Sequence, residues 1–303
     1  MKILVWLILC LIWGTTWFFI AVGLKFLPPF TFSAARFILA VLILACIIFI
    51  KKIPLPKTSK EWKLILLTGF LQFSINYSTV FWGEQYISSG LAAVLQAMIT
   101  VFGLALAWIH LPNERITKLK IFAVVLGVIG VATIFIEQLQ INNWWAFAGC
   151  VAIVIGAYAA AQASVLIKAK GGGIHPASLV FSQMSFGVLP VIVYALVREG
   201  NPLSFNWTWA AFGCILYLTL LGTIAAFWLY YWLLSKIEST KAMMISLVTP
   251  LIAVIIGAIF LGEKLPPQTF LGGVLILSSV SLIAFRKRVN RRDAETQSET
   301  GAE

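Results

Sequence analysis

Uncharged polar side chains recur at helical spacing inside the long apolar runs of this sequence. Gln72 and Asn76 are four residues apart, as are Gln96 and Thr100, so each pair lies on one helix face. Amides and hydroxyls exchange hydrogen bonds without carrying a charge, which suits recognition of a small polar solute. Polar groups in apolar runs usually face a bundle interior or a water-filled cavity. The pattern predicts a lined cavity; for any single residue, a hydrogen bond that merely joins two helices is the alternative.

Other runs add residues of the same kind. Trp13, Thr16 and Trp17 share a face of the first run, and Tyr158 and Gln162 share a face of the sixth. Pro250 lies in the middle of the ninth run. It removes a helical hydrogen bond, and the resulting bend either lines a cavity or serves only packing.

Arg36 is the one cation inside an apolar run. It either extends outward to lipid headgroups or acts inside, where it would pair with backbone carbonyls or with a solute carboxylate. The corresponding residue of the second half is Gln183, since each lies seven residues beyond a proline, Pro29 or Pro176. The predicted substrate pathway comprises Trp13, Thr16, Trp17, Arg36, Gln72, Asn76, Gln96, Thr100, Tyr158, Gln162, Gln183 and Pro250.

Catalytic machinery is missing from the sequence pattern. No Asp or Glu lies deep in an apolar run, and His110 and His175 sit at the ends of runs without a carboxylate at helical spacing. Metal-ligand spacings and nucleophile-turn motifs are also absent from the sequence. The sequence therefore predicts neither an enzyme nor a bound metal or cofactor.

Ion coupling has one candidate. Proton-driven carriers generally use a carboxylate embedded in the membrane, and the nearest is Glu84, at the outer end of the third run. The sequence predicts either exchange without ion coupling or weak proton coupling through Glu84.

Composition sets the class of protein that positions these residues. The chain has 303 residues, 61% of them hydrophobic and 11% charged, whereas a soluble domain has roughly 25% charged residues. Apolar runs of about 20 residues follow one another, which predicts a polytopic all-α membrane protein in a lipid bilayer. The net charge of +11 comes from basic residues in short loops and the tail, so it does not predict nucleic-acid binding.

Ten membrane spans can be placed along the chain. They are residues 3–24, 30–50, 62–82, 88–109, 119–136, 144–167, 176–197, 209–234, 242–261 and 268–285. With the N-terminus in the cytoplasm, eighteen Lys and Arg residues fall on the cytoplasmic side and three on the outer side. Both termini are therefore predicted to be cytoplasmic.

The chain also repeats itself over a long period. Residues 91–116 return in altered form as residues 241–265, and the copies close with Glu114-Arg115 and Glu263-Lys264. Five spans per half is an odd number, so the halves enter the membrane from opposite sides, as in transporters built from inverted repeats. The predicted organisation is a first repeat at 1–137, an outer loop at 138–143, a second repeat at 144–285 and a basic, polar cytoplasmic tail at 286–303.

Several of these features resemble the EamA family of the drug/metabolite transporter superfamily. They are the segment Ile12–Trp17 (IWGTTW), Pro29, Arg36 and the closing Gly-Glu-Lys-Leu at 262–265, together with the five-plus-five layout. The resemblance implies a ten-helix carrier of the inner membrane, usually an exporter of amino acids, other metabolites or drugs. It also implies a cavity surrounded by helices one to four and six to nine. Family members often have proline where this chain has Thr100, so the first half is expected to bend less than the second.

The residues and the resemblance together predict alternating-access transport of a small organic solute, most simply efflux of an amino acid or a drug-like compound. Import of a nucleotide-sugar or cofactor, and a membrane sensor or scaffold that moves nothing, are the alternatives. The partners expected are the small-molecule substrate and the bilayer, and both a monomer and a homodimer remain open.

Overall fold

The structure is a computed structural model that describes residues 1–87, 89–114, 116–134, 144–261, 267–268 and 270–282. The described residues form helices and loops, with no strand among them. The helices of residues 1–134 are α1 (Lys2–Gly23), α2 (Pro29–Ile50), α3 (Ser59–Gly69), η1 (Phe70–Asn76), α4 (Tyr77–Gly83), α5 (Ser89–Gln96), α6 (Met98–His110) and α7 (Lys118–Ile134). Those of residues 144–282 are α8 (Trp144–Lys170), α9 (Pro176–Arg198), η3 (Pro202–Ser204), α10 (Trp209–Thr219), η4 (Leu220–Ala225), α11 (Ala226–Lys236), α12 (Ser239–Met243), α13 (Ile245–Leu261) and a helix over 270–282.

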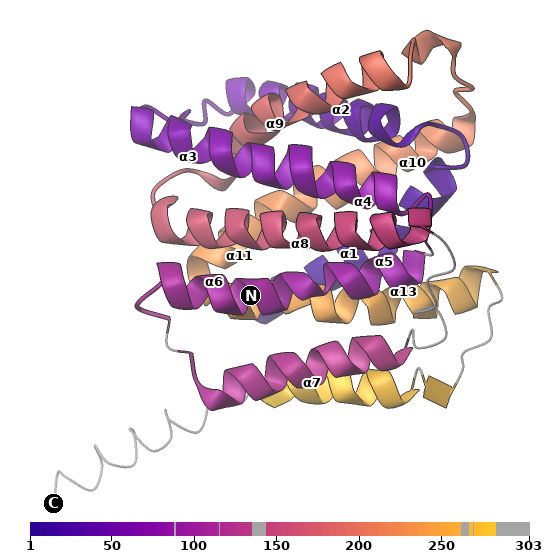
Figure 1. The fold of residues 1–303 in the computed structure, drawn as a ribbon. Helices are drawn as coiled ribbons and strands as arrows, with labels where there is room; N and C mark the ends of the chain where they lie inside the picture. The colour runs from indigo at the N-terminus through magenta and orange to yellow at the C-terminus, as the bar shows by residue number, and fades with distance from the viewer. Residues whose placement is uncertain (88, 115, 135–143, 262–266, 269, 283–303) are drawn as a thin grey trace, which may run out of the picture.

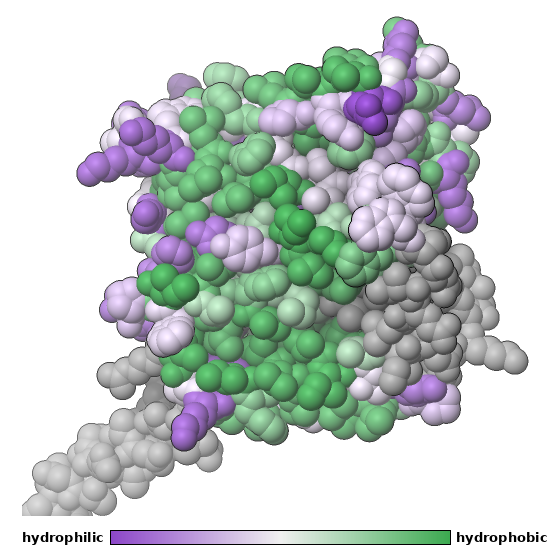
Figure 2. All heavy atoms as spheres, viewed as in Figure 1, coloured by the Kyte–Doolittle hydropathy of each residue, from purple (hydrophilic) through white to green (hydrophobic). Residues whose placement is uncertain are grey.

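Six helices in these described ranges are long and apolar enough to cross a membrane. They are α1, α2, Ser59–Gly83, α8, α9 and Trp209–Lys236, and shorter apolar helices accompany them at Met98–His110, Ser239–Ala253 and Phe270–Leu282. In Figure 2 hydrophobic side chains cover the middle of the visible face, and hydrophilic ones gather at its edges. The predicted all-α membrane class is confirmed. The count of ten spans and the side of the termini stay predictions.

Prolines and short polar side chains begin several helices where the sequence places them. Pro29 and Pro176 are the first residues of α2 and α9, where the missing N–H costs no helical hydrogen bond. At the start of α3, the Thr58 hydroxyl accepts a hydrogen bond from the backbone N–H of Glu61, and the Glu61 carboxylate accepts one from the backbone N–H of Thr58.

Two helices contain π-helical segments at matching places. The helix Ser59–Gly83 passes through η1 and the helix Trp209–Lys236 through η4, and the two segments begin about 150 residues apart. A π-turn shifts the helical register and is frequent at functional sites. Gln72 and Asn76 lie in η1, and Gly222 and Thr223 lie in η4.

Two other helices are interrupted, again at matching places. The expected span 88–109 consists of α5 and α6 with a break at Ala97, and the expected span 242–261 is preceded by α12 and broken from it at Met244. After each break the backbone closes a three-residue turn, from Thr100 N to Ala97 O at 3.0 Å and from Leu247 N to Met244 O at 3.1 Å. Tightened turns of this kind keep backbone groups bonded where a helix changes direction.

The helices of residues 1–134 pack mainly against those of residues 144–282 (Figure 1). Helix α2 lies against α9, α1 against α13, and α6 against α8. At the edge of the bundle, α7 lies beside the helix over 270–282, where Gly130 approaches the backbone of Gly272. Neither half therefore encloses a core alone, and the centre of the molecule lies between them.

Glycine permits a close crossing of α3 and α9. A Cβ atom on Gly187 of α9 would lie 2.5 Å from the carbonyl oxygen of Gly69, at the end of α3. Small residues let membrane helices approach until their backbones touch, which replaces the hydrophobic driving force that is missing in lipid.

The crossing gives a stability prediction. Replacing Gly187 with Ala should lower the free energy of unfolding by about 1–3 kcal/mol, because backbone atoms of Gly69 cannot move aside cheaply. Thermal unfolding in detergent measures the effect. Gly213→Ala in α10 is the matched control, since a Cβ there meets nothing within 4 Å. Equal midpoints for the two variants would contradict the prediction.

Candidate functional site

A cavity of about 110 Å³ lies between the two sets of helices. By the same measure one water molecule needs about 10–15 Å³, so the cavity accommodates a small solute or several waters. Its lining comes from α1, η1, α4, α5, α6, α8, α11, α12 and α13. The lining residues are Trp13, Thr16, Trp17, Ile20, Gln72, Asn76, Tyr77, Val80, Gln96, Ile99, Ala160, Ser164, Phe227, Tyr230, Ala242, Met243, Ile245, Ser246 and Thr249.

Three amides form one polar side of the cavity. Gln72 and Asn76 come from η1, and Gln96 is the last residue of α5, directly before the break. The side-chain nitrogen of Gln96 donates to Oδ1 of Asn76 at 2.8 Å. The Oε1 of Gln96 is buried without a hydrogen-bond partner in the described part of the chain. A buried acceptor of this kind favours a donor supplied by water or by a bound solute.

Hydroxyl groups line other parts of the wall. Tyr230 of α11 donates from its hydroxyl to Ser164 Oγ of α8 at 3.1 Å. Thr16 donates to the backbone carbonyl of Trp13 at 2.7 Å. These side chains are bonded to the protein itself and keep a second lone pair for a solute.

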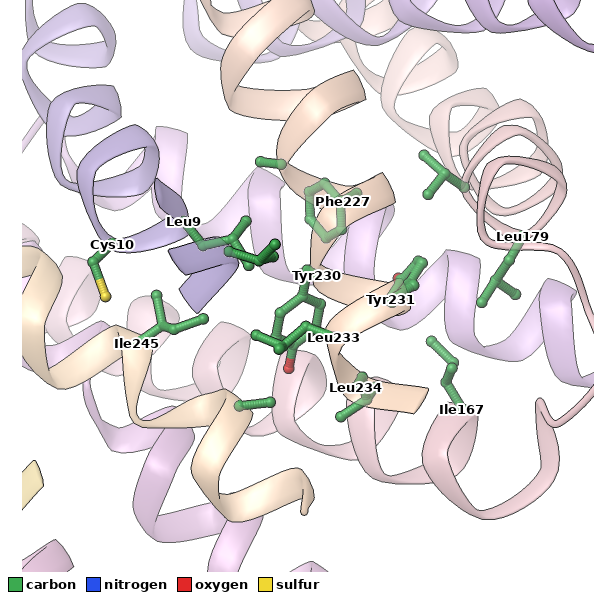
Figure 3. Close-up of a cluster of buried hydrophobic side chains, with 14 of the residues drawn as sticks. Leu9, Cys10, Ile167, Leu179, Phe227, Tyr230, Tyr231, Leu233, Leu234 and Ile245 are labelled. Atoms are coloured by element: carbon green, nitrogen blue, oxygen red, sulfur yellow. The ribbon is translucent and has the colours of Figure 1, made fainter. Parts of the chain in front are cut away.

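Aromatic rings form a broad apolar part of the wall. The ring centroid of Trp13 lies 5.6 Å from that of Phe227 and 5.2 Å from that of Tyr230. Figure 3 shows how these α11 residues project between neighbouring helices, with Leu9 of α1 on one side and Leu179 of α9 on the other. Such packing fixes the rings, so the wall has a defined shape.

Six of the residues predicted for the substrate pathway line this cavity together. They are Trp13, Thr16, Trp17, Gln72, Asn76 and Gln96. Residues at helical spacing share one face of their helix. The inward faces of η1 and α1 both point into the cavity, so these side chains meet there.

Arg36 lies behind the wall rather than in it. Its side chain is 1% exposed, so the headgroup alternative is wrong. The guanidinium donates from Nε to Thr223 Oγ1 at 2.7 Å and from Nη2 to the carbonyl of Gly222 at 3.1 Å. Both acceptors belong to η4, and the Gly222 carbonyl also receives the indole N–H of Trp13 at 3.3 Å. Of the two inside roles predicted from the sequence, the structure shows the pairing of Arg36 with a backbone carbonyl.

Gln183 occupies the matching place on α9 and makes the matching kind of contact. It is fully buried, and its side-chain nitrogen donates to Thr68 Oγ1 of α3 at 2.6 Å. Arg36 thus joins α2 to η4, and Gln183 joins α9 to α3. Gln183 does not line the cavity.

Tyr158 and Gln162 lie away from the cavity. The wall receives Ala160 and Ser164 of the same helix, and two residues along an α-helix is a rotation of about 200°. Tyr158 is accordingly 48% exposed, with its ring edge-on to Phe102. The small side chains face the cavity because they leave room for it.

Thr100 and Pro250 lie beside the two helix breaks. Thr100 Oγ1 bonds to the carbonyl of Met243 at 3.0 Å and to Ser246 Oγ at 2.9 Å, which connects the two interrupted helices. Both copies are interrupted, and α13 continues through Pro250; that the first copy bends less stays a prediction. Proline has no N–H, so the Ser246 carbonyl one turn earlier receives the Thr249 hydroxyl instead, at 3.3 Å.

Glu84 lies one helical turn beyond Val80, a lining residue, just past the end of α4. Its carboxylate is buried, and neither oxygen has a hydrogen-bond partner among the residues the structure describes. Burial raises the pKa of the Glu84 carboxyl well above its usual range. Burial thus disfavours the charged form of this carboxyl relative to an exposed one.

Sequence reasoning missed several lining residues. Tyr77 and Tyr230 stand among many aromatic residues of the apolar runs, and no spacing rule separates them from ordinary packing rings. Ser164 carried a weak signal, since it is a lone hydroxyl on a face of small residues, and Ser246 shares its face with Thr249.

None of the lining residues carries a charge. Within the described ranges, no three His, Cys, Asp or Glu side chains lie close enough to hold a metal ion. The arrangement can surround an uncharged or zwitterionic solute with amides, hydroxyls and aromatic rings.

Fold and cavity together define a class: a multi-pass helical membrane protein with a central, largely uncharged cavity between two sets of helices. Comparison with known proteins identifies the family. The chain belongs to the EamA-like transporter family, whose sequence description matches residues 1–136 and 147–285. The predicted family and the predicted multi-pass location in the cell membrane are confirmed.

Relatives match over nearly the whole chain. The uncharacterized transporter YoaV of Bacillus subtilis is 26% identical over 91% of this chain and 94% of its own length. The uncharacterized inner membrane transporter YedA of Escherichia coli is 26% identical over 92% of this chain and 89% of its own. A protein of Salmonella typhimurium named a probable amino-acid metabolite efflux pump is 26% identical, covering 94% of this chain and 95% of its own.

One solved crystal structure has the same fold. It superimposes with a TM-score of 0.77 at 12% sequence identity, covering 95% of this chain and 97% of the other.

Thiol labelling tests whether the cavity is wet. In a background without Cys10, Cys46, Cys150 and Cys214, a Ser246→Cys variant should react with a small methanethiosulfonate cation, because Ser246 lines the cavity. Ser182→Cys on α9 is the control, since Ser182 is 1% exposed and outside the lining. Equal protection of both thiols would mean that the cavity is closed to the reagent.

Proposed function

We propose that this protein is a secondary transporter that moves a small organic solute by alternating access, in the direction of efflux, through the cavity between its two halves. The observation that carries the proposal is the position of the cavity. It lies where two interrupted helices, α5–α6 and α12–α13, meet two helices with π-turns. Irregular helices at membrane depth are tolerated where they line a cavity, and they are typical of transporter binding sites.

The proposed architecture is ten spans in two inverted five-helix repeats, with both termini in the cytoplasm. The matching π-turns, the matching breaks and the paired contacts of Arg36 and Gln183 support a repeat. Basic side chains gather at one end of the bundle, where Lys2 and Lys168 donate to carbonyls at the end of α11. Such an end is the expected cytoplasmic side.

An amino acid or a related zwitterion is the proposed substrate class. Amides and hydroxyls can hydrogen-bond both an ammonium and a carboxylate, and aromatic faces attract cations. One relative is named a probable amino-acid metabolite efflux pump, which agrees with this choice. Import of a nucleotide-sugar is less well supported, because several phosphate charges would need Lys or Arg among the lining residues.

Substitution of the three cavity amides tests the proposed transport pathway. Replacing Gln72, Asn76 and Gln96 together with Leu should lower counterflow of labelled amino acids in proteoliposomes by about tenfold or more, since each lost amide removes about 0.6–2 kcal/mol of hydrogen bonding. Gln162→Leu, outside the lining, is the matched control. Full counterflow by the triple variant at normal expression would refute the proposed pathway. Absence of counterflow in the wild type would favour a sensor.

Coupling is proposed to use Glu84, if the carrier is proton-coupled. Burial raises the pKa of the Glu84 carboxyl, and hydration of the same carboxyl would lower the pKa again, so proton uptake and release could follow its exposure. No charged group contributes to that shift; burial alone does.

A Glu84→Gln variant separates the two coupling modes. Gln mimics the protonated carboxyl, so the variant should keep counterflow and lose any dependence of net transport on a pH gradient. Parallel proteoliposome assays with and without the gradient measure this. If wild type and variant show the same indifference to the gradient, the protein exchanges solutes without proton coupling.

A further inference from the structure

The buried guanidinium of Arg36 lacks a compensating carboxylate. Its Nε and Nη2 atoms are bonded to Thr223 and Gly222, while Nη1 is buried with no partner in the described chain. The carboxylates of the described residues serve elsewhere. Three of them accept hydrogen bonds at helix starts: Glu61 at α3, Glu114 at α12 through Ser239, and Glu199 at α2 through Phe30 and Thr31. Glu238 forms ion pairs with Lys120 and Lys241. Glu84 is not among the groups that act on Arg36.

Hydrogen bonding alone does not require this charge. At the matching place on α9, Gln183 joins its neighbouring helix through an amide, with the same direction of donation. An uncompensated buried charge costs far more free energy than a buried amide. The two halves therefore make the same kind of interhelical hydrogen bond with different side chains. Only the Arg36 side chain places a cation beside the cavity.

The cation lies one side chain behind the cavity wall. The guanidinium carbon is 4.9 Å from the ring centroid of Tyr77 and 5.2 Å from that of Phe37. Tyr77 lines the cavity, and so does Trp13, whose indole N–H shares the Gly222 carbonyl with Arg36. Arg36 therefore places a positive charge against the wall of a cavity whose own lining residues are uncharged.

We propose that Arg36 sets the charge selectivity of the cavity. Its positive charge, acting across Tyr77 and Trp13, favours solutes that carry a carboxylate over neutral or cationic solutes of the same size. The inference rests on the proposed function for its substrate class but concerns binding, which is measurable without transport. At a separation of roughly 8 Å and an effective dielectric of about 20, one charge pair changes affinity on the order of tenfold or more.

Three probes of one shape test the proposal. Leucine carries an ammonium and a carboxylate, 4-methylpentanoate only the carboxylate, and leucinamide only the ammonium. Affinities come from ligand-induced thermal stabilisation of the purified full chain, measured as a function of probe concentration. The wild type should bind leucine and 4-methylpentanoate about tenfold more tightly than leucinamide.

Substitutions at position 36 identify the cause. Arg36→Gln reproduces the side chain found at Gln183 and should reduce the preference to within about twofold. Arg36→Lys keeps the charge and should retain the preference. Gln183→Leu is the matched control: it removes the equivalent helix contact and should lower stability without altering the preference.

Each outcome decides the proposal. Carboxylate preference that survives in Arg36→Gln, or that is absent from the wild type, overturns it. If Arg36→Gln fails to fold, loss of the preference in a folded Arg36→Lys variant overturns the role of charge. Carboxylate-selective binding without counterflow would leave this inference standing while the proposed transport function fails.

Discussion

A chain that crosses lipid has to satisfy nearly every backbone and side-chain polar group within itself, because hydrocarbon offers no hydrogen bonds. Regular helices satisfy their own backbone groups, whereas two of the irregular places here receive side-chain donors. The Gly222 carbonyl in the π-turn η4 receives both Arg36 and Trp13. The Ser246 carbonyl that Pro250 leaves without its helical donor receives the Thr249 hydroxyl. The cavity is the place where such departures converge.

The same requirement explains how the two halves hold together. Contacts between apolar side chains gain little in lipid, so close backbone approach and interhelical hydrogen bonds have to supply the cohesion. Gly69 and Gly187 provide the first, and Thr100 with Ser246 provides the second at the junction of the two interrupted helices. That junction adjoins the cavity, because Ser246 also lines it.

Helical spacing predicted Gln72, Asn76 and the Trp13–Trp17 face correctly as neighbours in space, because a periodic pattern fixes which side chains share a face. It failed for Tyr158 and Gln162, since periodicity groups residues without saying which face turns inward. On α8 the inward face is the one with small side chains, Ala160 and Ser164. The burial of Arg36 was equally beyond the sequence, which left outward and inward positions both open. Its partners are 186 and 187 residues away along the chain.

The sequence by itself determined the membrane class, the family and the repeat of a distinctive stretch, because composition, hydrophobic run length and motif order are properties of the chain alone. Only the tertiary structure decided where the helices break and which contacts the corresponding side chains of the two copies make. The helix breaks fall at Ala97 and Met244, where the backbone turns. They do not fall at Thr100 and Pro250, the corresponding positions at which the two copies differ in residue type. Arg36 and Gln183 occupy equivalent places, yet one puts a charge behind the cavity and the other does not. The residue types come from the sequence, whereas the burial of each side chain and the helix it meets are set by packing.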